Sequence, residues 1–216
     1  MAAAAVCACS TSLGAQADQT LYVVRYIEAT AASQGQVATL LKQFVESSRA
    51  DGAVRFEALQ STTHPNEFLM LEVWKDQKTL DAHTEAAHSR QFRMRVEPLL
   101  LAPADDRLCV ATFVAPPRGG RGLAYVVTHV DVPGNFRDAT LPALQALAER
   151  SRSEAGNLQF DVVHQKNRTN HFTVIGVWAD QKGEGAHQAA PYTMSFRGTV
   201  SPMLGALYDQ RWYRPL

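Results

Sequence analysis

The sequence has few cysteines, no excess of either charge and no long apolar run. Its 216 residues include 3 cysteines, and 21 lysines and arginines balance 21 aspartates and glutamates. A net charge of zero excludes the basic surface that usually binds nucleic acid or an anionic membrane. No stretch reaches the ~20 apolar residues of a membrane-spanning helix. With 46% hydrophobic and 19% charged residues, the composition is typical of a soluble globular protein without nucleic-acid or membrane partners.

Motifs that hold cofactors are scarce as well. The sequence contains no GxGxxG, no P-loop and no cysteine-centred nucleophile. His83 and His88 are five residues apart, which on a continuous helix separates two side chains by about 140°. We therefore expect that they do not share a metal ion as histidines at i, i+4 do. The sequence predicts a protein with no metal and no cofactor.

Residues 1–17 differ from the rest of the chain, because they carry no charged side chain and end in Ala15-Gln16-Ala17. That ending is typical of a signal-peptidase site, but no lysine or arginine precedes the apolar stretch. Two interpretations stay open. A cleaved secretory signal predicts a periplasmic or secreted protein that starts near Asp18, whereas a disordered tail or a mis-assigned start predicts a cytoplasmic one. Cys109 is the single cysteine beyond this segment, so no internal disulfide is expected.

The chain repeats itself at an interval of 104 residues. Residues 52–100 align with residues 156–204 without a gap, and 17 of the 49 pairs are identical, where chance gives ~3. The most similar stretch is VWKDQK at 73–78 over VWADQK at 177–182. We therefore expect two modules, 18–115 and 123–216, which the glycine- and proline-rich linker 116–122 joins.

Each copy shows the same order of expected elements, β-α-β-β-α-β. β-Branched and aromatic runs predict strands at 21–28, 54–61, 67–74 and 107–114, and at 123–132, 158–165, 171–178 and 206–213. Apolar residues at i, i+3, i+4 and i+7 predict the first helix of each copy. The second helical regions, about 77–100 and 185–204, are expected to break near Ser89 and Thr193. Gly183 and Gly185 predict a late helix start in the second copy.

This order predicts an α+β fold of two tandem ferredoxin-like modules, each an antiparallel sheet with both helices on one face. The other face of such a sheet needs a cover. Because the chain carries two modules, we expect their sheets to pack face to face as an intramolecular dimeric α/β barrel. A further homo-oligomer is compatible with this arrangement.

The segment from Phe68 to Trp74, followed by His83 and Phe92, resembles the antibiotic biosynthesis monooxygenase family. The resemblance covers both copies and implies a small dimeric α/β barrel with E-x-W at the end of the third strand. The family includes cofactor-free monooxygenases of quinols and polyketides, haem-degrading enzymes and isomerase-like relatives. Phe92-Arg93 stands where the haem-degrading relatives have a histidine, which disfavours haem degradation.

Strand alternation places Phe68, Met70, Glu72 and Trp74 on one face, which we expect to face the helices. A carboxylate, an indole N–H and the His83 imidazole in an apolar cleft could deprotonate a phenol or hydroquinone. The resemblance implies that the resulting anion reduces O₂ without a cofactor. The predicted catalytic residues are His83, Glu72 and Trp74, and the predicted substrate-binding residues are Phe68, Met70, Phe92, His88, Trp178, His187, Tyr192 and Phe196.

The alternative interpretation gives these residues a structural role, with Trp74 a core aromatic, His83 a core-edge or capping histidine and Glu72 its partner. The chain is then a non-catalytic ligand-binding or stress-associated barrel protein.

The second copy departs from the pattern. Gly176 stands where the first copy has Glu72, and Tyr192 replaces His88. These changes predict that any chemistry lies in the first copy and that the second is a structural or binding half. His129 and Asp131 on the first strand of that copy could compensate for the missing carboxylate.

Overall fold

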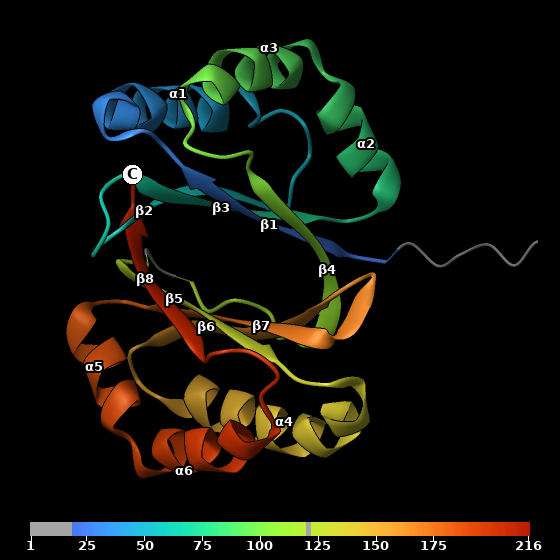
Figure 1. Ribbon diagram of the computed structural model, residues 1–216, viewed down its shortest axis with the longest axis vertical. Helices are drawn as coiled ribbons and strands as arrows, with labels where there is room; N and C mark the ends of the chain where they lie inside the picture. Colours follow the sequence, from blue (N-terminus) through green and yellow to red (C-terminus); the bar gives the residue numbers. More distant parts are fainter. Residues whose placement is uncertain (1–18, 120–121) are drawn as a thin grey trace, which may run out of the picture.

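The computed structural model describes residues 19–119 and 122–216 (Figure 1). The expected signal or tail, 1–17, lies outside the described residues, and so do positions 120 and 121 of the expected linker. Within the described part, no helix combines the length and apolarity that a membrane crossing requires.

Both modules have the expected order of elements, with the second helical region divided in two. The first module consists of β1 Leu21–Glu28, α1 Gln34–Ser47, β2 Arg55–Ser61, β3 Glu67–Trp74, α2 Gln77–Glu85, α3 Ala87–Val96 and β4 Asp105–Phe113. The second consists of β5 Ala124–Asp131, α4 Arg137–Ser153, β6 Asn157–Gln165, β7 Arg168–Trp178, α5 Gln181–Ala189, α6 Pro191–Val200 and β8 Asp209–Pro215.

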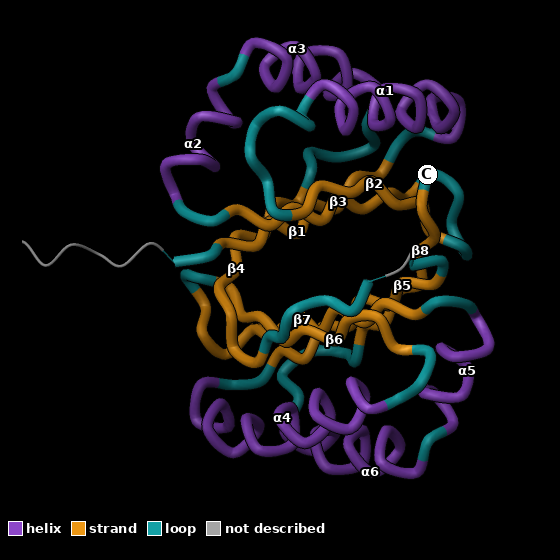
Figure 2. The backbone as a smooth tube through the Cα atoms, turned by 180° about the vertical axis from the view of Figure 1, so that it is seen from behind, coloured by secondary structure: helices purple, strands orange, loops and turns teal. Residues whose placement is uncertain are grey.

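The eight strands form one closed barrel in the order β1-β3-β2-β8-β5-β7-β6-β4. Strand β4 pairs with β1 of its own module and with β6 of the other, and β8 likewise pairs with β5 and β2. The helices of each module cover the outside of its own half of the barrel (Figure 2). The predicted intramolecular dimeric barrel is confirmed, and β4 and β8 close both of its seams.

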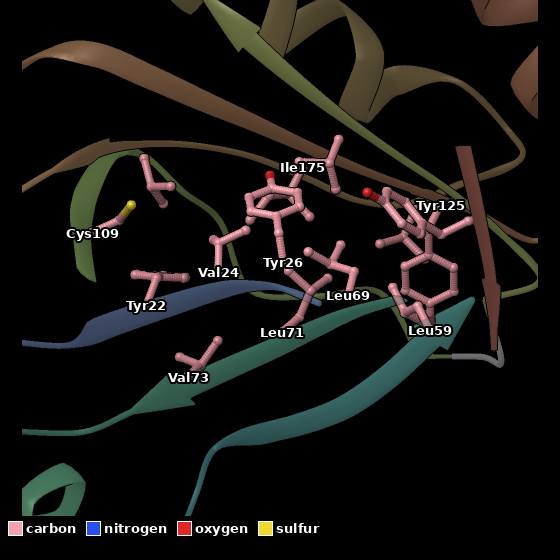
Figure 3. Packing of buried hydrophobic residues seen from close by; sticks show 14 residues of the cluster. Tyr22, Val24, Tyr26, Leu59, Leu69, Leu71, Val73, Cys109, Tyr125 and Ile175 are labelled. Carbon is pink, nitrogen blue, oxygen red and sulfur yellow. The ribbon is translucent and has the colours of Figure 1, made fainter. Parts of the chain in front are cut away.

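Alternation along each strand separates a lumen core from three clusters on the helix side. Tyr22, Val24, Tyr26, Leu69 and Leu71 point into the lumen, where they meet residues of the second module (Figure 3). On the helix side, Phe68 and Met70 pack with apolar residues of α1 and α3. The face that we predicted for Phe68, Met70, Glu72 and Trp74 is therefore the one that the structure has.

The second helical region is broken in both copies, as expected, but the breaks lie at Ala86 (φ −62°, ψ 147°) and Ala190 (φ −63°, ψ 135°), three residues before the expected positions. The expected late start of the helix in the second copy was wrong, because α5 begins at the same repeat position as α2. The side chain of Asp180 caps α5 by accepting a hydrogen bond from the Gly183 N–H at 2.7 Å, and this offsets the low helix propensity of the glycines.

Candidate functional site

Glu72 of β3 is a buried carboxylate with one oxygen engaged and one free. Trp74 Nε1–H donates a hydrogen bond to Glu72 Oε2 at 2.9 Å, and the Glu72 residue is 2% exposed. Glu72 Oε1 has no hydrogen-bond partner among the described residues, although Arg25 NH1 lies 3.8 Å away. An unsatisfied buried carboxylate oxygen is costly for the fold and is therefore a candidate for a functional group.

Arg25 of β1 is the cation beside this carboxylate. Its Nε and NH2 donate to the two carboxylate oxygens of Asp106 in β4, at 2.6 and 3.0 Å. Burial opposes the charge of Arg25, but the neighbouring Glu72 and Asp106 outweigh this effect and raise the pKa of the guanidinium. Asp106 thus fixes the guanidinium, and NH1 remains directed at Glu72.

Arg25 also forms part of the wall of a cavity of about 560 Å³ between β1, α3 and the segment after it. Ile27, Phe92, Val96 and Leu100 supply apolar lining. Of the residues that we predicted to bind substrate in the first module, Phe92 reaches this cavity, whereas Phe68 and Met70 lie in the core beneath α1.

The carboxylate partner of His83 is Asp51 and not Glu72. His83 Nδ1 lies 2.6 Å from Asp51 Oδ2, and no hydrogen bond between His83 and Glu72 is present in the part of the chain that the structure describes. Asp51 belongs to the turn after α1, immediately before Gly52, whose φ of +82° favours glycine. The predicted Glu72–His83 pair is therefore wrong.

His88 Nε2 lies 2.8 Å from the same Asp51 oxygen. The expectation that His83 and His88 diverge by about 140° was wrong, because the helix breaks at Ala86 between them. Two imidazole nitrogens and one carboxylate oxygen lie within 4.8 Å of one another.

Aromatic rings surround His83. Its ring centroid lies 4.7 Å from that of Trp74 and 5.2 Å from that of Phe56. Phe44 of α1 stacks on Phe92 at 4.0 Å. Trp74 is fully buried, so its ring also serves as a core aromatic, which is one part of the structural alternative.

The second module repeats this aromatic set around His187. Its ring centroid lies 4.8 Å from that of Trp178 and 5.5 Å from that of Phe160. A Cβ at Gly176 would overlap the six-membered ring of Trp178. The Trp178 indole therefore occupies the space that the Glu72 side chain takes in the first module.

Gly176 offers His187 no carboxylate, as expected, but another element supplies one. Glu154, which follows α4, places Oε2 at 3.2 Å from His187 Nδ1, and Tyr192 OH donates to its Oε1 at 2.5 Å. Burial and this hydrogen bond raise the pKa of Tyr192 to about 12. Burial lowers the pKa of His187, against the opposing effect of Glu154.

The proposed compensation by the first strand of the second module was also wrong. His129 points into the barrel lumen, where Tyr26 OH lies 2.7 Å from its Nε2, and Asp131 pairs with His171 at 3.1 Å.

The sequence of the chain is similar to that of a known protein family. The family model for antibiotic biosynthesis monooxygenases matches residues 20–95 and 123–197, which run from β1 into α3 and from the start of β5 into α6. The chain belongs to the antibiotic biosynthesis monooxygenase family. The Bacillus subtilis protein named "Putative monooxygenase YcnE" is 31% identical over 81 residues, which are 37% of this chain and 85% of that protein.

Solved structures share the whole fused architecture. A Fusobacterium nucleatum protein named "Putative monooxygenase" superposes with a TM-score of 0.83 at 14% identity, over 93% of this chain and 94% of that one. A protein described as anthrone oxidase-like gives a TM-score of 0.72 at 14% identity, over 93% and 92% of the two chains. At these identities the likeness shows a common fold.

In the second module of this family member, the predicted binding residues lie in two places. Trp178 and His187 line a cavity of about 20 Å³ between sheet and helices, which is room for little more than water. Tyr192 and Phe196 instead line a groove between α4 and α6. Gln188 Nε2 and Thr193 Oγ1 belong to residues lining the small cavity and have no hydrogen-bond partner among the described residues.

Sequence reasoning missed Asp51, Glu154 and Arg25. Asp51 and Glu154 both precede the ungapped repeat alignment, and they stand at positions that do not correspond, since 51 plus 104 is 155. Arg25 did carry a signal, because it is a charged residue on the apolar helix-side face of β1, between Val23 and Ile27.

Proposed function

We propose that the chain is a cofactor-independent monooxygenase that uses O₂ on a small aromatic, quinol-type substrate, with its chemistry in the first module. The observation that carries this proposal is Glu72, whose free oxygen faces Arg25, and Arg25 lines the cavity of about 560 Å³. A buried base next to a fixed cation fits a substrate whose hydroxyl group must lose a proton.

Glu72 Oε1 is the proposed proton acceptor. Trp74 fixes the other carboxylate oxygen, so Oε1 is presented without a competing hydrogen bond. The phenolate that forms would face Arg25 NH1. The two hydrogen bonds from Arg25 to the Asp106 carboxylate hold the guanidinium in place. Charge stabilisation by a preorganised cation in a buried site is stronger than in water.

The deprotonated substrate supplies all the electrons that the reaction needs. It transfers one electron to O₂, and the aryloxyl radical and superoxide then combine to form a C–O bond. Loss of water from the resulting hydroperoxide leaves a carbonyl. For a hydroquinone, the sum is hydroquinone plus O₂ giving hydroxyquinone plus water, with one oxygen atom in each product.

His83 and Trp74 act as positioning residues in this proposal. The Trp74 indole touches both partners, since it donates to Glu72 and packs against the His83 ring. Asp51 fixes the orientation of His83 through Nδ1. Phe92 provides the aromatic wall of the cavity against which a planar substrate would lie.

Oxygen consumption tests the proposal. Chelator-treated protein without added cofactor should consume O₂ with a panel of hydroquinones, and Glu72→Gln should lower the rate by about 10²- to 10⁴-fold. Glu154→Gln is the matched control, because it changes the carboxylate of the second module, which Trp178 Nε1 approaches at 3.4 Å. Equal losses in both variants with unchanged melting temperatures, or activity that requires a metal or flavin, would contradict the proposal.

The second candidate function is non-catalytic ligand binding. The groove of about 620 Å³ between α4 and α6, which Tyr192 and Phe196 line, favours it. If it is correct, aromatic ligands should raise the melting temperature without oxygen uptake, and Tyr192→Ala should weaken that effect while Glu72→Gln leaves it unchanged.

A further inference from the structure

Asp51, His83 and His88 form a second cluster of titratable side chains, which contains neither the proposed base Glu72 nor its cation Arg25. His83 also packs beside the proposed site, but ion binding by this cluster does not require that the proposed reaction takes place. We propose that these three residues form a binding site for a divalent ion of the Zn²⁺ class.

The donor atoms converge on one point. His83 Nδ1 and His88 Nε2 lie 2.6 and 2.8 Å from the same oxygen, Asp51 Oδ2. Neutral imidazole nitrogens and a carboxylate oxygen are preferred ligands of Zn²⁺. Three protein ligands leave a fourth position for water, as in zinc sites of the open kind.

An ion would require the three donor atoms to adjust. Zn²⁺ bonds to nitrogen and oxygen are ~2.0–2.2 Å, so tetrahedral donors lie ~3.3 Å apart. The two imidazole nitrogens, which lie within 4.8 Å of each other, must come to that spacing. Asp51 must retreat by roughly half an ångström from the two imidazoles. It is carried by a turn before Gly52, and its side chain is 18% exposed, so a shift of this size does not disturb the core.

The site is also reachable from solvent. The His88 side chain is 26% exposed, whereas that of His83 is 4% exposed and lies among aromatic rings. One ligand is thus fixed by the core, and two lie at the surface, where an ion can arrive. The ion would tie the turn after α1 to both α2 and α3.

The second module supplies an internal comparison. There Glu154, His187 and Tyr192 meet in the same way, but the third group is a phenol that donates its proton to Glu154. A protonated phenol is a poor ligand for Zn²⁺, so the second module should not bind the ion. His88→Tyr reproduces the arrangement of that module, which folds with a tyrosine at this position.

Titration of the chelator-treated full chain with Zn²⁺ alone, by calorimetry, tests the site, together with the visible absorption of added Co²⁺. We expect one ion per chain, and His88→Tyr should weaken binding by at least about 100-fold, since losing even an outer-shell partner costs ~10- to 100-fold. His187→Ala is the matched control and should keep one ion with unchanged affinity.

Two further outcomes complete the test. Tyr192→His should create a second, weaker site in the second module. Failure of the native chain to bind Zn²⁺ at micromolar concentration, or equal binding by His88→Tyr, would overturn the inference. Melting curves identify a variant that has lost its fold, and in that case Asp51→Ala replaces His88→Tyr with the same expected loss.

Discussion

At the scale of single residues, the two repeated tryptophans differ in the carboxylate that each one engages. Trp74 donates to Glu72 on its own strand at 2.9 Å, and Trp178 donates to Glu154 after α4 at 3.4 Å. Trp74→Phe leaves both Glu72 oxygens without a hydrogen bond, so we expect a loss of ~1–3 kcal/mol in the free energy of unfolding beyond the packing change. Chemical denaturation measures it.

Trp178→Phe is the control for that prediction. Glu154 keeps Tyr192 and His187 as partners when the indole is gone, and the lost hydrogen bond is longer. The loss should therefore be smaller than for Trp74→Phe. Equal losses would mean that the Trp74–Glu72 hydrogen bond contributes no more to the free energy of unfolding than the Trp178–Glu154 hydrogen bond.

Gly176 has a specific steric role, because it lies against the Trp178 ring. Any Cβ there overlaps the Trp178 ring, so Gly176→Ala should displace the indole and destabilise the second module by ~1–3 kcal/mol.

In α5, a methyl group at Gly185 would have no heavy atom within 4 Å, and Gly185→Ala should stabilise the helix by up to about 1 kcal/mol. Thermal melts followed by tryptophan fluorescence measure the stability of each variant. An unchanged stability of Gly176→Ala would contradict the prediction for Gly176.

The same residues show how far sequence reasoning reaches. Trp74, Trp178, His83 and His187 were found because the repeat preserves them in sequence and the strand period fixes the face of the tryptophans. Asp51 and Glu154 were not found, since two side chains of different length reach equivalent histidines from positions one residue out of step. A repeat alignment cannot detect such a replacement, because the equivalence exists only in space.

At the scale of elements, the break between α2 and α3 decides the geometry of the candidate metal site. Pro191 occupies the first position of α6, and Ala87 occupies the equivalent position of α3. Ala86 already has the extended ψ of 147° that a residue before proline needs. Ala87→Pro should therefore be tolerated and stabilise the protein by ~0.4–1 kcal/mol through the unfolded state.

Gln91→Pro serves as the contrasting variant, because it places proline inside α3, where it removes a helical hydrogen bond. A loss of ~3 kcal/mol or more is expected there. Urea denaturation of both variants gives the comparison. If Ala87→Pro is as damaging as Gln91→Pro, then α2 and α3 act as one continuous helix in solution.

Sequence reasoning predicted the existence of this break but not its position. The break was expected near Ser89 and Thr193, whereas the clearest residue-level signal, Pro191, lies in the second copy. In the first copy the break is imposed by packing: Leu80 and His83 of α2 and Phe92 of α3 are all buried, and one straight helix cannot turn all three toward the sheet.

At the scale of the whole molecule, the duplication places equivalent residues against each other in the barrel lumen. Tyr26 of β1 and His129 of β5 occupy matching strand positions, and Tyr26 OH hydrogen-bonds His129 Nε2 at 2.7 Å. Arg107 and Arg211 are likewise equivalent, and their guanidiniums lie 5.0 and 5.1 Å from the Tyr26 ring centroid. The repeat predicted that the modules meet, but only the closed barrel shows which residues do.

His129 makes the stability of this interface depend on pH. Burial and the nearby Arg107 lower its pKa from 6.5 to about 3, against a smaller opposing effect of Asp209. Folded His129 therefore stays neutral where the unfolded chain binds a proton. The resulting stability is fully present above pH ~6.5 and is lost as the pH falls toward 3, at up to about 1.4 kcal/mol for each pH unit.

Comparison of the native chain with His129→Gln isolates this contribution. Glutamine can still accept the Tyr26 hydroxyl but does not titrate, so its free energy of unfolding should fall less steeply between pH 6.5 and 4.5. Burial also lowers the pKa of His164 and His187, but both remain in the variant and cancel in the difference. Urea denaturation at pH 7, 5.5 and 4.5 supplies the values. Parallel losses in the two proteins would mean that His129 becomes protonated inside the folded barrel, with water or a rearranged Asp209 beside it.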